Sequence, residues 1–304
     1  MQPVPSSVME ITMRSMMFAA VLMAAAAIMP HPAAAAEKIK VVAAENFYGD
    51  LASQIGGEHV EVTSILSNPE DDPHLFESSP STARALSTAA IVVYNGADYD
   101  PWMDKLLSAS ANPDRKAIVA AGLTGHKAGD NPHLWYELKT FPAAATALAA
   151  ELEKRDAAHA ADYKANLAKF EASFSELTKQ VDAIKTKYKD TQVTATEPVF
   201  GYMAEALGLK MLNQDFQTAI MNDSEPSPSQ VAAFENSLKD GSAKILFYNN
   251  QVTDETTKRL LQIAKDHKVA VVGVTETMPA GTAIQAWFDG QLGQVDVALS
   301  GLTQ

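Results

Sequence analysis

Two short segments of the chain carry the same small group of residues around a histidine. Residues 71–77 read DDPHLFE and residues 130–136 read DNPHLWY, so His74 and His133 both stand in the pattern Asp-Asp/Asn-Pro-His-Leu-aromatic. The proline before each histidine restricts the backbone, and we expect the aromatic residue that follows to be buried and to hold the loop. Two imidazoles presented in this way are natural ligands for a transition metal.

Two glutamates supply further candidate ligands. Glu197 directly follows the strand candidate QVTAT (192–196), and Glu276 directly follows VAVVGVT (269–275). In open α/β sheets, ligands bind beyond the carboxyl ends of the strands. Two imidazoles with two carboxylates suit Mn(II), Fe(II) or Zn(II), whereas Ca(II) and Mg(II) prefer oxygen ligands. Taken singly, each residue has an alternative interpretation, as a structural histidine or as a helix-capping or turn carboxylate.

The other histidines are weaker candidates. His59 begins a strand candidate, while His159 and His267 lie on predicted helices with charged neighbours, and each is typical of a solvated side chain. His126 lies in the segment GHKAGD, where a role in collecting metal stays open. His31 belongs to a segment that we expect the mature protein to lack.

That segment, residues 1–36, has the pattern of a secretory signal peptide. Residues 15–29 form an apolar run behind Arg14, and Ala34 and Ala36 are the small residues that a signal peptidase reads. We predict cleavage after about Ala36. An uncleaved membrane anchor is the alternative, but the run is short for a membrane span and no charged stop follows it.

Composition excludes several classes of protein. The chain has no cysteine, which excludes disulfides, a thiolate metal site and a lipidated cysteine. The formal net charge is −13 at pH 7 and there is no basic cluster, which argues against nucleic acid as a partner. A signal peptide without a lipid anchor predicts a soluble protein of a Gram-negative periplasm.

Strand-like runs alternate with helical stretches in both halves of the chain, and this pattern predicts parallel sheets covered on both faces. The pairs Ser79-Pro80 and Ser227-Pro228 have the residue types of a helix N-cap and first helical position. Between the halves, apolar residues recur at spacings of three and four, which predicts one long amphipathic helix. A coiled coil or a bundle helix is the alternative, but a rigid connector between the halves explains the pattern better.

The predicted fold is therefore α/β, with two doubly wound lobes joined by one long rigid α-helix, each lobe holding a mostly parallel sheet of about four strands. We place the signal peptide at 1–36 and the N-terminal lobe at 37–150. The connecting helix is placed at 151–190 and the C-terminal lobe at 191–304.

The chain resembles a known family, the cluster A-I metal-binding proteins of ABC importers, which take up zinc or manganese. The resemblance covers essentially all of the mature chain. The segments that show it are ENFYGDLASQIGG, the DPHLFE loop, VVYNGADYDPWMDKLL, NPHLWY, the long central helix, TEPVFGYMAEALGL and VVGVTETMP. It implies one metal ion between two lobes, held by one residue from each of four loops. The first two family ligands match His74 and His133, the third matches Glu197, and the fourth, usually Asp, is Glu276 here.

The resemblance also implies a function. It indicates a monomeric, non-enzymatic periplasmic protein that binds a divalent transition metal tightly and delivers it to a membrane permease, with no organic substrate. Many zinc-importing relatives carry a long histidine-rich loop, whereas this chain has only LTGHKAGDNPH. With a glutamate in the third position, the chain looks more like the manganese branch. Zinc generally binds such sites more tightly than manganese, so both metals stay open.

Two other functions stay open from the residues alone. A metallohydrolase could use the same histidines and carboxylates, but the chain has no H-E-x-x-H, no G-x-S-x-G and no Gly-rich phosphate loop. A binding protein for an organic solute could use the histidines as hydrogen-bonding groups. An adhesin role, known for some relatives, is compatible with the sequence as well.

Overall fold

The computed structural model describes residues 37–68 and 76–301. The predicted signal peptide and His74 lie outside the described residues. From Lys38 onward the chain forms one compact unit, and this unit contains two four-stranded sheets. Within the described part of the chain, no helix is both long enough and apolar enough to span a membrane.

The first sheet has the strand order β2-β1-β3-β4, and all neighbouring strands are parallel. Its strands are β1 (Ile39–Glu45), β2 (Val60–Leu66), β3 (Ile91–Tyr94) and β4 (Lys116–Val119). Alternate residues of a strand point to opposite faces. In β1, Val41 and Val42 belong to different apolar clusters, so the sheet is buried on both faces, as expected of a parallel sheet.

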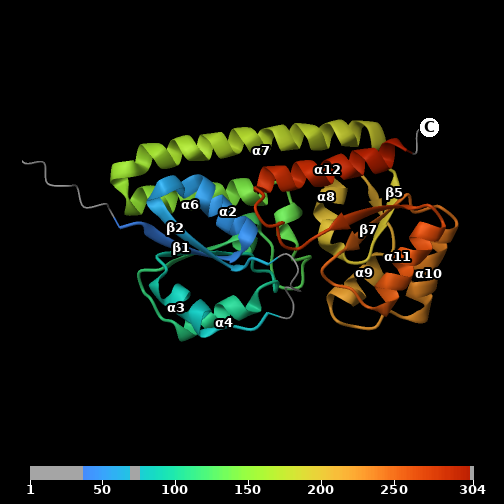
Figure 1. Cartoon of the computed structure of the whole chain (residues 1–304), viewed down its shortest axis with the longest axis horizontal. Coiled ribbons are helices and arrows are strands. Elements are labelled where there is room, and N and C mark those ends of the chain that lie inside the picture. The colour runs from blue at the N-terminus through green and yellow to red at the C-terminus, as the bar shows by residue number, and fades with distance from the viewer. Residues whose placement is uncertain (1–36, 69–75, 302–304) are drawn as a thin grey trace, which may run out of the picture. The chain divides into compact units, whose positions relative to one another are not determined.

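Helices cover each face of this sheet (Figure 1). The cluster around Val41 includes side chains from α2 (Asn46–Gly56) and α6 (Thr140–Arg155). The cluster around Val42 includes side chains from α3 (Pro80–Thr88) and α4 (Pro101–Ala109). The hydroxyl of Ser79 accepts a hydrogen bond from the backbone N–H of Thr82, so the predicted N-cap of α3 is confirmed.

The second sheet has the order β6-β5-β7-β8 and is also parallel throughout. Its strands are β5 (Gln192–Ala195), β6 (Lys210–Met211), β7 (Ile245–Asn249) and β8 (Ala270–Val274). Leu246 belongs to an apolar cluster with side chains of α9 (Gln214–Met221), α10 (Pro228–Lys239) and α11 (Glu255–Asp266). Phe247 belongs to the cluster that contains side chains of α8 (Gly201–Ala206) and α12 (Ile284–Ser300).

One long helix, α7 (Ala160–Tyr188), runs along both halves of the unit (Figure 1). It has 29 residues, which at 1.5 Å per residue makes it about 43 Å long. It packs against α2 and α6 on the first half and against α12 and α8 on the second. Its buried side chains are Tyr163, Phe170, Phe174, Leu177, Val181 and Ile184. A single apolar cluster includes these residues and residues of both sheets, so the predicted two-sheet fold with a long connecting helix is confirmed.

The remaining elements are short. They are α5 (Ala120–Thr124) and the 3-10 turns η2 (Gly57–His59), η4 (Leu134–Tyr136), η5 (Ala157–His159) and η6 (Pro198–Phe200). The sequence favours a strand over residues 116–122, but β4 ends at Val119, opposite Tyr94, where β3 also ends. The chain then turns into α5, which ends at Gly125 in the left-handed conformation.

Candidate metal centre

His133 lies in the loop between α5 and η4, and Asn131 sets the orientation of its ring. The Oδ1 atom of Asn131 accepts a hydrogen bond from the backbone N–H of His133 and lies 2.6 Å from its ring Nδ1. The Nδ2 atom of Asn131 donates to the carbonyl of Pro198 at 2.9 Å, so the oxygen of the amide must be the atom that faces the ring. Nδ1 of His133 therefore carries a proton, which leaves Nε2 as the ring nitrogen through which the neutral imidazole can bind a metal.

A residue at the carboxyl end of the first sheet holds the rest of this loop in place. Asn95, directly after β3, donates from Nδ2 to the carbonyl of Pro132 at 2.7 Å and accepts from the hydroxyl of Tyr48 at 3.0 Å. Trp135 is buried, as predicted for the aromatic residue after the histidine, and its ring contacts that of His133. His133 itself is completely buried. The imidazole is thus held in place before any ligand binds.

The two predicted glutamates follow β5 and β8, and one residue at the end of β7 joins them. Glu197 and Glu276 are both buried. The Nδ2 atom of Asn249 donates to Oε2 of Glu197 at 2.5 Å and to Oε1 of Glu276 at 2.7 Å. The Oδ1 atom of Asn249 accepts from the backbone N–H of Gln251, so the amide group cannot be the other way round. A single amide therefore holds two buried carboxylates side by side.

Both glutamates are buried, which an exposed turn carboxylate would not be. Glu197 occupies the position before η6, yet its side chain makes no capping hydrogen bond. The backbone N–H groups of Glu276 and Thr277 both donate to Oε1 of Gln251, at 2.6 Å and 3.1 Å. Gln251 also donates to the hydroxyl of Thr277 at 2.8 Å. These bonds fix the loop after β8, so the position of the Glu276 carboxylate is determined by the fold.

Three of the four predicted ligands come together. The Nε2 atom of His133 lies 3.8 Å from Oε2 of Glu276, and Asn249 bonds Glu276 to Glu197. Metal–ligand bonds of about 2.0–2.2 Å place ligand atoms about 3–3.5 Å apart, so His133 and Glu276 need to approach each other only slightly to share an ion. His74, the fourth predicted ligand, lies outside the described residues.

Two further buried acidic residues, Glu45 and Asp100, belong to the first half of the unit. Asp100 accepts hydrogen bonds from the backbone N–H groups of Asn95 and Gly96, yet burial raises its pKa to about 6. Burial, together with the charge of Asp100, raises the pKa of Glu45 well above its usual value. Burial and then the charges of Glu276 and Glu45 raise the pKa of Tyr99. The region therefore concentrates acidic groups in an interior where burial favours their protonated, neutral forms.

A family model described as the periplasmic component A of a zinc-uptake complex, ZnuA, matches residues 41–295. The chain belongs to this family. Among curated relatives, the manganese-binding lipoprotein MntA of Bacillus subtilis (strain 168) is 24% identical over 248 residues, which cover 78% of this chain and 80% of that protein. The resemblance to metal-binding proteins of zinc and manganese ABC importers is thus confirmed. The family is one of solute-binding proteins of such importers, which is not a class of enzymes.

Solved structures agree with the fold. The periplasmic zinc-binding protein TroA from Treponema pallidum has a TM-score of 0.74 at 17% identity, covering 86% of this chain and 99% of that one. A crystal structure of ZnuA has a TM-score of 0.71 at 21% identity, covering 86% of this chain and 100% of that one. The two-sheet architecture with its long helix is therefore the architecture of these proteins.

Sequence reasoning missed the residues that position the candidate ligands. Asn131 stands inside the DNPHLWY segment, next to His133, where its role in setting the tautomer has no sequence signal of its own. Asn249 ends the strand candidate AKILFYN, and the rule that ligands gather at the carboxyl ends of parallel strands would have included it. The same rule would have included the buried Glu45, which ends β1, whereas Gln251 carries no comparable signal.

His126 does not join this centre. Its Nε2 lies 3.0 Å from a carboxylate oxygen of Glu137, and its Nδ1 lies 3.5 Å from one of Asp130. The two acids thus take opposite nitrogens of one ring and do not converge on a common point. Glu137 is also paired with Lys139 at 3.1 Å. His126, Asp130, Glu137 and Lys139 therefore form a polar network at the edge of the loop.

Proposed function

We propose that this protein binds one divalent transition-metal ion, Zn(II) or Mn(II), through His74, His133, Glu197 and Glu276, and delivers it to the membrane permease of an ABC importer. The observation that carries the proposal is the pair of buried carboxylates held by Asn249 next to the oriented Nε2 of His133. Two carboxylates balance the charge of a divalent cation, and imidazole nitrogen favours transition metals over Ca(II) and Mg(II).

The preorganised ligands support carriage of the ion in preference to catalysis. Asn131 fixes the tautomer of His133, and Gln251 fixes the loop that holds Glu276. Outer partners of this kind orient metal ligands and commonly affect metal affinity by about 10–100-fold. Four protein ligands would complete a tetrahedral shell, whereas a catalytic zinc site keeps one position open for water or substrate. We therefore assign the metal as cargo.

The remaining parts of the proposal follow from the family and the composition. MntA is named a manganese-binding lipoprotein and TroA a zinc-binding protein, and the glutamates here are compatible with either ion. We propose that the mature protein is a monomer in the periplasm. We also propose that it has no lipid anchor, because the sequence contains no cysteine for acylation.

The test is metal titration of the mature protein, purified without a histidine tag and stripped of metal. Calorimetry with Zn(II) and Mn(II) is expected to show tight binding that His133→Ala and Glu276→Ala each weaken strongly. His267→Ala is the matched control, because His267 is exposed at the end of α11 and its loss should change nothing. Wild-type affinity in the Glu276→Ala variant would remove Glu276 from the site, and the absence of binding in the wild type would overturn the proposal.

A further inference from the structure

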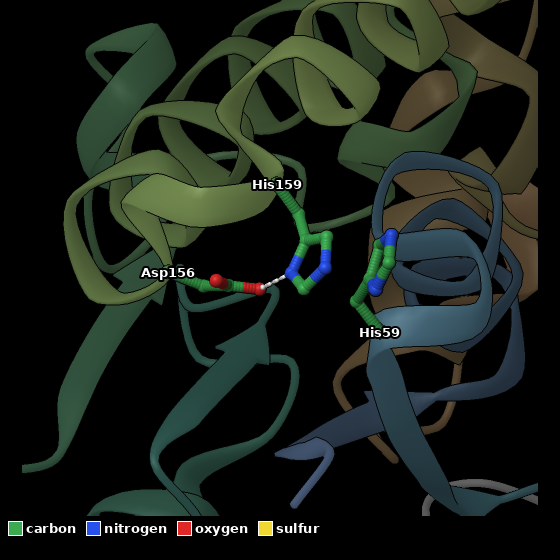
Figure 2. A group of neighbouring side chains, drawn as sticks. All are labelled: His59, Asp156 and His159. Atoms are coloured by element: carbon green, nitrogen blue, oxygen red, sulfur yellow. Dashed lines mark hydrogen bonds and ion pairs between the residues drawn. The ribbon is translucent and has the colours of Figure 1, made fainter. Parts of the chain in front are cut away.

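A second group of metal-ligating side chains lies at the beginning of the long helix. His59 ends η2, while Asp156 and His159 flank the connection between α6 and α7. Figure 2 shows the three side chains coming together from these two segments. One ligand atom from each residue can be chosen so that all three lie within 4.8 Å of one another. The sequence favours solvated histidines here, but both are half-buried, and their rings stack with centroids 3.9 Å apart.

The carboxylate of this group is held in place. The Oδ2 atom of Asp156 lies 2.6 Å from Nδ1 of His159 (Figure 2) and accepts a hydrogen bond of 2.8 Å from the hydroxyl of Tyr163. The ring of Tyr163 is buried and its edge contacts His59. On the other side, Nε2 of His59 lies 3.0 Å from a carboxylate oxygen of Asp162. Two imidazoles are thus flanked by two carboxylates, one of which is anchored by a core tyrosine.

We infer that His59, Asp156 and His159 form a second binding site for a divalent transition metal, with Zn(II) as the best-suited ion. Two nitrogens and one oxygen are a ligand set typical of zinc, and a water molecule can take the fourth position at this half-exposed edge. Ligand atoms on one zinc ion stand about 3–3.5 Å apart. Binding therefore requires the three side chains to rotate inward, the ring stack to open and the Asp156–His159 hydrogen bond to be replaced by metal bonds.

The site is separate from the proposed metal centre. Strand β1 pairs in parallel with β2 and β3, with Ile39 opposite Val60, so His59 lies at the amino end of the first sheet. Asn95, which holds the His133 loop, follows the carboxyl end of β3. A strand of seven residues at about 3.3 Å per residue separates the two edges by about 20 Å. The inference does not depend on the proposed function.

A metal ion at this position would join elements that are far apart in the sequence. It would tie the beginning of α7 and the end of α6 to β2, an edge strand of the first sheet. Only the single turn η5 and the flanking Asp156 connect α6 to α7. We expect an ion here to stabilise this connection, and hence the position of α7 on the first half.

The experiment is Zn(II) titration of the mature, tag-free protein in four forms: wild type, the double variant His59→Gln plus His159→Gln, His133→Ala, and His267→Ala. Glutamine keeps a hydrogen-bonding group at each position, and circular dichroism checks that the double variant is folded. We expect two zinc equivalents for the wild type and for His267→Ala, and the loss of one equivalent in the double variant. Equal stoichiometry in the wild type and the folded double variant would overturn the inference.

A second readout locates the ion directly. In the His133→Ala protein, Zn(II) should shift the imidazole NMR signals of His59 and His159 and leave that of His267 in place. Unshifted signals for His59 and His159 at saturating Zn(II) would refute the site even if the double variant failed to fold. If the proposed metal centre were wrong but the second site correct, the result would differ. The wild type would then bind only one zinc ion, and the double variant would bind none.

Discussion

The side-chain amide of Asn249 donates a hydrogen bond of 2.7 Å to the carboxylate of Glu276, and the same nitrogen bonds Glu197. These two acids come from different strand ends, and both are buried. Like charges at short range in an interior repel strongly. By donating to both, Asn249 holds the two carboxylates side by side, as the proposed metal site requires.

The first prediction concerns this amide. Asn249→Ala should weaken Zn(II) or Mn(II) binding by about 10–100-fold, the usual effect of losing an outer partner of a metal ligand. Calorimetric titration measures the change. Asn250→Ala is the matched control, because Asn250 is the exposed neighbour in the chain and makes no bond to the glutamates. Equal losses of affinity in both variants would mean that the loop as a whole matters, and not the amide of Asn249.

A second prediction concerns the tautomer of His133. Because Asn131 presents its oxygen to Nδ1 of the ring, the metal-free protein at neutral pH should hold His133 with the proton on Nδ1. Long-range nitrogen–proton NMR correlations distinguish the two ring nitrogens. Asn131→Ala should give a mixture of tautomers and weaken metal binding by about 10–100-fold. A proton found on Nε2 in the wild type would contradict the orientation described above.

Acid should release the metal from the proposed centre. Histidine and carboxylate ligands must be deprotonated to bind a cation, so the affinity at about pH 4.5 should be far below that at about pH 7.5. Competition with a chelator of known pH-dependent affinity measures both values. The same affinity at the two pH values would show that protons and metal do not compete, which would exclude imidazole ligation.

A fourth prediction concerns the buried acid beside the centre. Burial raises the pKa of Asp100 to about 6 in the folded state, against about 3.9 in an unfolded chain. Between these values the folded protein binds more protons than the unfolded chain, so the contribution of Asp100 to stability is largest below about pH 4 and falls as the pH rises through about 6. The magnitude is about 3 kcal/mol.

Urea unfolding of the metal-free protein tests this contribution. Asp100→Asn loses one of the two backbone hydrogen bonds to Asn95 and Gly96, so the variant should be less stable than the wild type at about pH 4. Its deficit relative to the wild type should nevertheless shrink by up to about 3 kcal/mol between about pH 4 and pH 7. A deficit that stays constant, or grows with pH, would mean that the pKa of Asp100 is not raised.

Sequence patterns were sufficient for the fold because its signals are local. The caps at Ser79 and Ser227 need only residues within the next turn, and both are present. The face of α7 follows from the spacing of residues such as Phe170 and Phe174, which are buried as a periodic pattern requires. The strand-end rule likewise indicated Glu197 and Glu276.

Sequence patterns did not predict the residues that position the ligands, because the partners of these residues are distant in the sequence. Nothing near Asn249 shows that its amide bonds two acids on other strands, and nothing near His59 shows that it stacks on His159. Such contacts depend on how the elements pack in space. An asparagine at a strand end has the same local pattern whether it forms a turn or supports a ligand.

The last prediction concerns the core that joins the two halves along α7. The ring of Phe174 contacts Phe141 of α6 and Phe288 of α12, and its side chain is buried. Removing a buried phenylalanine ring costs about 3–5 kcal/mol, from lost burial and from the cavity left behind. Phe174→Ala should therefore lower the free energy of unfolding by about that amount, measured by urea denaturation.

Lys179→Ala is the control, because Lys179 lies on the same helix with 68% of its side chain exposed, and it should change stability by less than about 0.5 kcal/mol. Because Phe174 contacts both halves, its loss should lower the stability of both halves together. Near-ultraviolet dichroism and intrinsic tryptophan fluorescence should then report one shared unfolding transition at a lower urea concentration. Two separated transitions in the wild type would show instead that the halves fold independently, and that the shared core along α7 does not couple them.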